Sequence, residues 1–245
     1  MRLRSAITGV LVLLAALTIS PVSATAAVLG GSGPYSAGYE TSFRLPNHTI
    51  YRPSTLPTDV KLPIVAWGNG ACRADGTWFE NILTEWASHG FLVIANGRPG
   101  GFGSTDSDML VESIDWAVAE NSRVGSKYRG RIDTTKVAVM GQSCGGIETY
   151  EVADDPRITT TVLWNSGLLS DSQNYLLARL RAPIAYFIGG PSDIAYENAM
   201  DDWRRVGTHY LKWRLKGDQA SKAQFVGTNC GLCTTDWDVM QKNLS

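Results

Sequence analysis

An apolar run passes directly into a glycine-flanked serine in the segment Lys136-Val137-Ala138-Val139-Met140-Gly141-Gln142-Ser143-Cys144-Gly145-Gly146. The run predicts a buried strand, and residues 147–152 predict a helix that the sequence Asp154-Asp155-Pro156 brings to an end. A serine at such a sharp turn is held in a strained conformation that raises its oxygen above the sheet. Small residues are needed on both sides because strand and helix pass too close for a Cβ atom. The segment therefore predicts a nucleophile elbow at Ser143, against the alternative of an ordinary glycine-rich turn.

The first residues have the composition of a signal peptide. Arg2 and Arg4 give a positive start, an apolar stretch follows over 7–19, and Ser23-Ala24-Thr25-Ala26 matches a small-residue cleavage site. The apolar stretch is too short for a membrane span. We therefore expect a signal peptide over residues 1–26, a single domain over 27–245, and a secreted protein without a membrane anchor.

The composition indicates a substantial core and an almost neutral surface. Of the 245 residues 44% are hydrophobic, eight are tryptophan, and the net charge is −1. No basic stripe, internal repeat or low-complexity segment is present. We therefore expect a monomer that binds neither nucleic acid nor anionic lipid.

Five apolar runs have the length of buried strands: 62–67, 91–96, 136–140, 160–165 and 183–188. They are nearly continuous in apolar residues, as strands covered on both faces are. A further edge strand is expected over 43–51. Helical patterns over 79–87 and 110–118 separate the strands. The alternation predicts an α/β fold with a doubly wound, mostly parallel sheet flanked by helices.

In such a sheet the functional site lies at the carboxyl ends of the strands. Five loops follow the predicted strands there: residues 68–72, 97–101, the elbow, 165–167 and 189–193. The sequence therefore predicts one site assembled from five loops.

Four cysteines in an exported chain favour disulfides, for which three pairings are possible. Cys72 and Cys144 each follow a predicted strand, so their loops meet at the same edge of the sheet. We expect a Cys72–Cys144 bond, with Cys230–Cys233 closing a small C-terminal loop. The rival interpretation of the second pair is a zinc or redox motif, which lacks a second pair of ligands nearby.

Acyl transfer by Ser143 needs donors for the oxyanion. The first is expected to be the backbone N–H of Cys144, directly after the nucleophile. The second is expected from Ala71, because Gly70-Ala71 lets the backbone approach the substrate. The alternative for the Ala71 loop is an ordinary tight turn.

Asp193 is the best candidate for the acid that orients the base. It follows a predicted buried strand by five residues and comes after the serine, in the order expected of this chemistry. The alternative role is an Asx turn or a cap for the helix that begins near residue 196. Asp201 and Asp202 are weaker candidates because they lie on that predicted helix.

The base is the difficult assignment because the chain has three histidines, His48, His89 and His209. The first two precede the serine, so only His209 follows the required order. His209 lies within an amphipathic helix predicted over 203–216, and no strand-like run separates it from Asp193. The alternative is an ordinary histidine on a helix surface.

Together these segments resemble secreted α/β-hydrolases related to dienelactone hydrolases and to bacterial cutinase-like polyester hydrolases. The resemblance is carried by Gly68-Asn69-Gly70-Ala71-Cys72, by Ala87-Ser88-His89-Gly90-Phe91-Leu92-Val93-Ile94-Ala95-Asn96-Gly97, by the elbow and by Cys230-Gly231-Leu232-Cys233. It implies the α/β-hydrolase fold, with Ser143 matching the nucleophile and Asp193 the acid. Such proteins usually have a further strand and a Gly-His-Gly-Gly-Thr-like loop after the acid. Here residues 199–206 run straight into a helix, so we expect that strand and its histidine to be absent.

Two functions follow from these observations. The first is a secreted serine esterase that forms an acyl-enzyme and acts on small or polymeric esters, with Ser143, Asp193 and His209 as its catalytic residues. The second is a catalytically impaired binding protein on a hydrolase scaffold, which the missing histidine loop favours. A thiol mechanism through Cys144 is a distant third. No metal or organic cofactor is called for.

Overall fold

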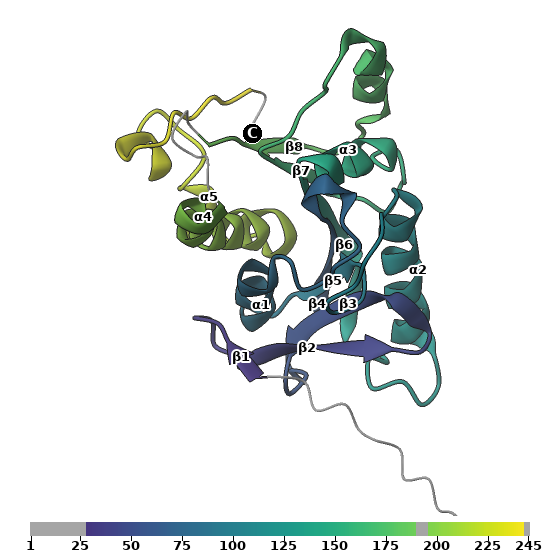
Figure 1. Cartoon of the computed structure of the whole chain (residues 1–245). Helices are drawn as coiled ribbons and strands as arrows, with labels where there is room; N and C mark the ends of the chain where they lie inside the picture. The colour runs from purple at the N-terminus through teal and green to yellow at the C-terminus, as the bar shows by residue number, and fades with distance from the viewer. Residues whose placement is uncertain (1–27, 190–195, 243–245) are drawn as a thin grey trace, which may run out of the picture.

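The computed structural model describes residues 28–189 and 196–242, so the predicted signal peptide lies outside the described residues (Figure 1). Eight strands form one sheet in the order β1-β2-β3-β5-β4-β6-β7-β8. Their bounds are β1 Val28–Gly30, β2 Ala37–Ser42, β3 Leu45–Pro53, β4 Leu62–Gly68, β5 Leu92–Asn96, β6 Ile132–Gln142, β7 Thr160–Trp164 and β8 Ile184–Phe187. Strands β4 to β8 are mutually parallel, while β1, β2 and β3 pair antiparallel at one edge. The predicted doubly wound, mostly parallel sheet is confirmed.

The five parallel strands coincide with the five apolar runs of the sequence, because apolar side chains on both faces are what such strands need. β6 is longer than its apolar run and begins at Ile132. The predicted edge strand is β3. Strands β1 and β2 were not predicted, since β1 has three residues and β2 is partly exposed and lacks an apolar run.

Helices cover both faces of the sheet (Figure 1). On one face lie α1 Glu80–Ser88, α4 Tyr196–Lys216 and α5 Gln219–Lys222, and on the other lie α2 Asp108–Ser122 and α3 Cys144–Glu151. Three 3₁₀ segments complete the chain: η1 Gly70–Cys72, η2 Asp171–Arg179 and η3 Leu232–Thr234. In the described part of the chain no strand follows β8, and no helix is long and apolar enough to cross a membrane.

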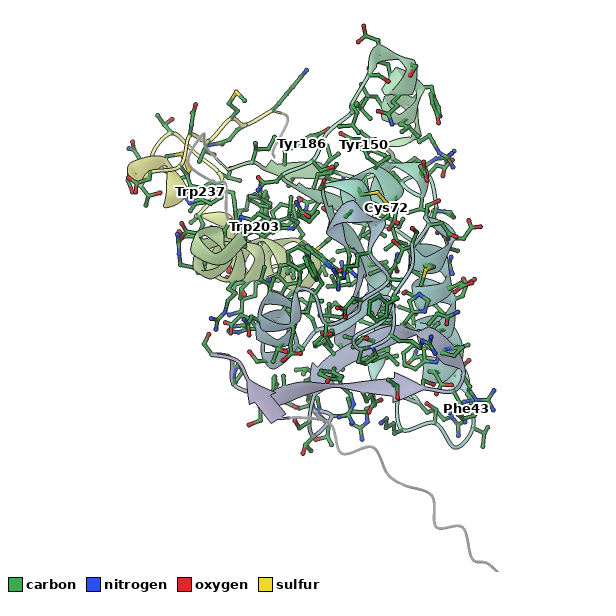
Figure 2. All side chains as sticks on the ribbon, in the orientation of Figure 1. Phe43, Cys72, Tyr150, Tyr186, Trp203 and Trp237 are labelled. Carbon is green, nitrogen blue, oxygen red and sulfur yellow. A yellow bond between two sulfur atoms is a disulfide. The ribbon has the colours of Figure 1, made fainter. Side chains whose placement is uncertain are left out.

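Aromatic side chains fix the position of α4 on the sheet. The Trp203 ring lies 5.0 Å from that of Trp164 at the carboxyl end of β7, and the Tyr210 hydroxyl lies 2.8 Å from Thr160 Oγ1 at its amino end. Helix α4 therefore runs antiparallel to β7. Figure 2 labels Trp203 on α4.

We expect Trp203→Ala to lower the free energy of unfolding by about 3–5 kcal/mol, because the buried indole also stacks on Phe79. Urea unfolding measures the loss. Trp78→Ala is the matched control, since the Trp78 side chain is 42% exposed and its removal leaves no buried cavity. Equal losses in the two variants would contradict the assigned packing of α4.

Candidate active site

Ser143 occupies a strained turn between β6 and α3. Its backbone has φ 50° and ψ −112°, a conformation that residues other than glycine adopt at a cost. The Ser143 side chain is exposed, while Gly141 and Gln142 before it are buried. The Ser143 N–H donates to the carbonyl of Trp164, and the Ser166 hydroxyl donates to the carbonyl of Ser143 at 2.7 Å. This geometry is that of a nucleophile elbow.

Glycines make this turn possible. A Cβ atom on Gly141 would lie 2.2 Å from the Gly145 carbonyl oxygen, and one on Gly145 would lie 2.1 Å from the Gly68 carbonyl oxygen. Both contacts are with backbone, which cannot swing aside as a side chain can. The strand-to-helix crossing therefore requires glycine on each side of the serine.

The predicted oxyanion donors are the backbone N–H groups of Cys144 and Ala71. Cys144 is the first residue of α3, so its N–H has no acceptor within the helix. Ala71 lies in η1 with φ 53°. Within residues 28–189 and 196–242, no hydrogen-bond acceptor is found for either N–H.

The two donor segments are joined covalently by the Cys72–Cys144 disulfide, which is labelled at Cys72 in Figure 2. A second disulfide joins Cys230 to Cys233. The structure thus contains both pairings expected from the sequence. The second pair is closed as a disulfide, and the described residues include no group of three or more metal-ligating side chains.

The side chain of Asn69 forms hydrogen bonds with the loop that contains Ala71. It is fully buried, accepts from Trp67 Nε1 at 2.9 Å, and its amide nitrogen lies 2.9 Å from the carbonyls of Arg73, Asp75 and Asn96. The Asn69 carbonyl in turn accepts from Gly145 N–H at 3.0 Å. The Asn69 side chain thus connects the ends of β4 and β5 with the loop. The backbone carbonyl of Asn69 bonds to α3. This role of Asn69 depends on contacts with distant segments, so no local sequence pattern predicts it.

We expect the double substitution Cys72→Ser with Cys144→Ser to lower the free energy of unfolding by about 4 kcal/mol. The reason is that this bond closes a long loop, with a sequence separation of 72 against 3 for Cys230–Cys233. Cys230→Ser with Cys233→Ser is the matched control and is expected to cost about 2 kcal/mol in the same entropy model. Denaturant unfolding compares them, and an equal or reversed order would refute this account.

A buried carboxyl group lies behind the elbow. Glu148 on α3 is 4% exposed, and its oxygens accept from the Thr105 hydroxyl at 2.5 Å and the Asn96 amide at 3.2 Å. Burial raises the pKa of Glu148 to about 7, although these two hydrogen bonds act in the opposite direction. No sequence pattern indicates this role, because an acidic residue on a short helix ordinarily faces solvent.

The folded protein therefore favours the protonated form of Glu148. The stability that this provides is present in full below pH about 4.5 and is lost as the pH rises through about 7. Relative to Glu148→Gln, we expect the wild type to lose on the order of 3 kcal/mol of unfolding free energy between pH 4.5 and 8. Chemical denaturation across that range measures the difference. Glu112→Gln, which removes an exposed carboxylate on α2, is the control, and it is expected to follow the wild-type curve.

The two remaining predicted catalytic residues are not assembled with Ser143. Asp193 lies outside the described residues, and so does the side chain of Asp201. The Asp202 carboxylate is exposed and pairs with Arg205 at 2.8 Å. His209 lies against α5, and its Nδ1 is 3.1 Å from Ser221 Oγ.

The register of α4 separates His209 from the elbow. Its neighbour Tyr210 bonds to Thr160, which pairs with Ala138 across the sheet. Ala138 precedes Ser143 by five residues, or about 16 Å of strand. In this arrangement His209 does not reach the serine, and its role as the base stays a prediction without support from the geometry.

The other two histidines are also engaged elsewhere. His48 is buried with Nε2 2.9 Å from the Met109 carbonyl, and His89 Nε2 lies 3.1 Å from Glu85. Burial lowers the pKa of both rings. None of the hydrogen bonds that these three histidines make goes to Ser143.

A family model described as "PETase: PET hydrolase-like" matches residues 15–194, which include the elbow, both oxyanion candidates and Asp193. The chain belongs to the PET hydrolase-like family. This is a family of serine carboxylic ester hydrolases with the α/β-hydrolase fold, as the sequence predicted. The match ends before His209.

Individual relatives agree with the family assignment. The chain is 33% identical over 129 residues to Cutinase est1 of Thermobifida alba, covering 50% of this chain and 41% of that protein. Cutinase 2 of Thermobifida cellulosilytica is 32% identical over 129 residues, covering 50% and 47%. Cutinase cut1 of Thermobifida fusca is 32% identical over 129 residues, covering 50% and 38%. The matched region thus spans less than half the length of these relatives.

Proposed function

We propose that this member of the PET hydrolase-like family is a secreted carboxylic ester hydrolase whose nucleophile is Ser143. The observation that carries the proposal is the exposed serine on a strained elbow, beside two backbone N–H groups without acceptors among the described residues. Such donors are worth about 10²–10³ in rate where they meet an oxyanion.

The proposed chemistry is acyl transfer in two steps. Ser143 Oγ attacks the ester carbonyl, whose oxygen becomes an oxyanion held by the N–H groups of Ala71 and Cys144. Collapse of this intermediate breaks the C–O bond, releases the alcohol with a proton, and leaves the acyl group on Ser143. Water then adds to the acyl group and the carboxylic acid leaves.

An exposed nucleophile favours esters that are themselves accessible, whether small or polymeric. Ser143 and Ala71 are both exposed. Beyond Ala71 the loop presents the Trp78 ring, with the Arg73 guanidinium 4.1 Å from its centroid. The matched relatives are named cutinases, and the family description names PET hydrolases, which supports polyesters as a substrate class for this chain.

A second function is favoured by the positions of the histidines. Because each bonds elsewhere, the described residues provide no histidine base for Ser143. Loss of the base from a serine triad costs about 10⁶ in kcat, and the oxyanion donors alone retain about 10³–10⁴ over water. The second candidate is therefore a catalytically impaired protein that binds esters or acyl groups at the same elbow.

Labelling with a fluorophosphonate tests the nucleophile directly. We expect the purified protein to be labelled at Ser143, located by mass spectrometry, and we expect Ser143→Ala to abolish the label. Hydrolysis of a p-nitrophenyl ester, followed in parallel, measures turnover. Labelling with turnover supports the esterase. A folded protein with neither label nor turnover refutes it and leaves the impaired binding protein.

His209→Ala and His89→Ala separate the roles of the histidines. Since α4 holds His209 about 16 Å from the level of Ser143 along the sheet, we expect both variants to retain labelling to within about twofold. Loss of labelling in His209→Ala alone would show that α4 moves in solution and that His209 is the base after all.

Secretion is part of the proposal and rests on the two disulfides together with the composition of the first residues.

A further inference from the structure

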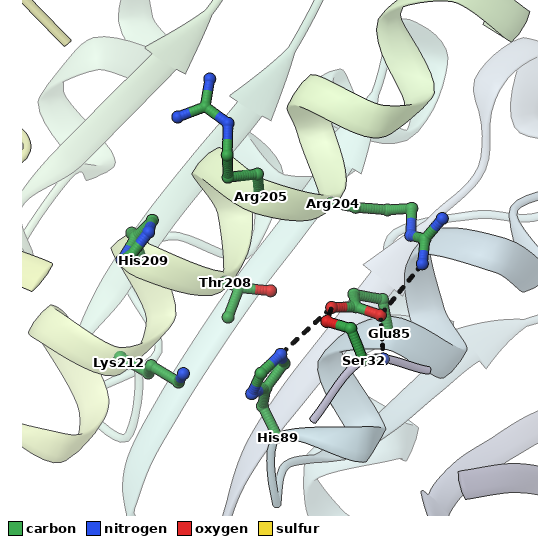
Figure 3. Close-up of a pocket in the computed structure, with 8 residues that line it drawn as sticks. All are labelled: Ser32, Glu85, His89, Arg204, Arg205, Thr208, His209 and Lys212. Atoms are coloured by element: carbon green, nitrogen blue, oxygen red, sulfur yellow. Dashed lines mark hydrogen bonds and ion pairs between the residues drawn. The ribbon is translucent and has the colours of Figure 1, made fainter. Parts of the chain in front are cut away.

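A hollow lies between α1 and α4 (Figure 3). These two helices cover the face of the sheet opposite α3 (Figure 1). The hollow is a cavity of about 430 Å³, lined by residues of both helices and by Ser32. Those that matter here are Glu85, His89, Arg205, Thr208 and Lys212. His209 also lines it, so the cavity lies toward the amino end of β7 and away from Ser143.

The single acidic group of the lining is already fully bonded. Glu85 accepts from the backbone N–H of Ser32 at 2.8 Å and from the Ser32 hydroxyl, and His89 Nε2 and Arg204 lie 3.1 and 3.2 Å from its oxygens (Figure 3). Burial alone would raise the pKa of Glu85, but hydrogen bonds from Ser32, Arg204 and His89 lower it to about 2. Glu85 is therefore ionised at neutral pH, and its oxygens already interact with groups of the protein itself.

Other polar groups of the lining lack partners. The Thr208 side chain is 5% exposed, and its hydroxyl has no hydrogen-bond partner among the described residues. The Nδ1 atom of His89 is likewise buried without one. Unpaired buried polar atoms are uncommon because each costs about 1–3 kcal/mol. Both residues line the cavity, so a molecule bound there is a candidate partner for these two atoms.

The charge of the cavity indicates what that ligand is. Lys212 forms no ion pair with any residue that the structure describes, and Figure 3 shows it on the same side of the cavity as His89. Arg205 adds a second cation, which among the described residues pairs with the exposed Asp202. With Glu85 neutralised by its own partners, the lining carries surplus positive charge.

We propose that this cavity binds a small organic oxyanion, a carboxylate or a phosphate, with Lys212 supplying the charge and the Thr208 hydroxyl a hydrogen bond. A volume of about 430 Å³ suits an organic molecule better than a bare ion. The site is separate from the elbow and does not depend on the chemistry of Ser143.

His89 gives the site a dependence on pH. Its Nε2 faces the ionised Glu85 and donates to it, so Nδ1 of the neutral ring is an acceptor. Burial and the nearby Lys212 lower the pKa of His89, Glu85 raises it, and Lys216, which donates to the His89 carbonyl, lowers it. A protonated ring turns Nδ1 into a donor with positive charge. Anion binding therefore strengthens as the pH falls.

Isothermal titration of the purified chain with sodium citrate and with sodium phosphate, at ionic strength fixed by NaCl, tests the site. We expect saturable binding with a dissociation constant of about 1 mM or below for at least one probe. Tighter citrate binding identifies a carboxylate ligand and tighter phosphate binding a phosphate. Ser143→Ala is expected to bind as the wild type does, so this result is independent of ester hydrolysis.

Lys212→Gln and the isosteric Thr208→Val are each expected to weaken binding about tenfold, since each removes one interaction with the anion. Lys136→Gln removes an exposed cation at β6 and is the matched control, with an expected change below about twofold. Circular dichroism verifies folding of each variant. Absence of saturable binding up to about 20 mM, or equal weakening in the control, would overturn the proposal.

Discussion

The close approach of α3 to the sheet is the constraint on which the site depends. Gly145 rests on the carbonyl of Gly68 with no room for a Cβ atom, so helix and strand meet backbone to backbone. This contact forces the chain to turn within one residue, and that residue is Ser143 at positive φ. The same approach places Cys144 within disulfide reach of Cys72 and carries Glu148 into the interior behind the elbow. The strain of the turn is tolerated because these contacts surround it.

Much of this arrangement could be predicted from the sequence because it is local. The elbow is encoded by adjacent residues, and each parallel strand by its own apolar run, so both were found. Strands β1 and β2 were missed because β1 is very short and β2 has no apolar run, so their pairing was visible only in the fold. Glu148 was missed for a related reason, since the Thr105 and Asn96 groups that make its burial tolerable come from distant segments.

The assignment of a base shows where chain order stops being informative. His209 follows the serine in the chain, as the chemistry requires. The order of residues does not determine in which direction α4 runs along the sheet. Trp203 contacts Trp164 and Tyr210 contacts Thr160, so α4 runs from the carboxyl end of β7 toward its amino end. His209 therefore lies away from the edge of the sheet where the loops meet. The residue that the sequence offered as a base instead lines a cationic cavity together with Lys212 and Thr208. The elbow thus lies at the carboxyl edge of the sheet, whereas the cavity lies between α1 and α4 on one of its faces.

The bond between Cys72 and Cys144 makes the shape of the candidate oxyanion site depend on conditions outside the molecule. Both candidate donors belong to segments that this one bond clamps together, and its formation requires an electron acceptor. In a reducing compartment the Ala71 loop would be held by hydrogen bonds, chiefly those of the Asn69 side chain and that from the Thr105 N–H to the Cys72 carbonyl at 2.7 Å. The redox potential of the surroundings therefore sets how rigidly the donors are held, and full preorganisation is reached where disulfides persist.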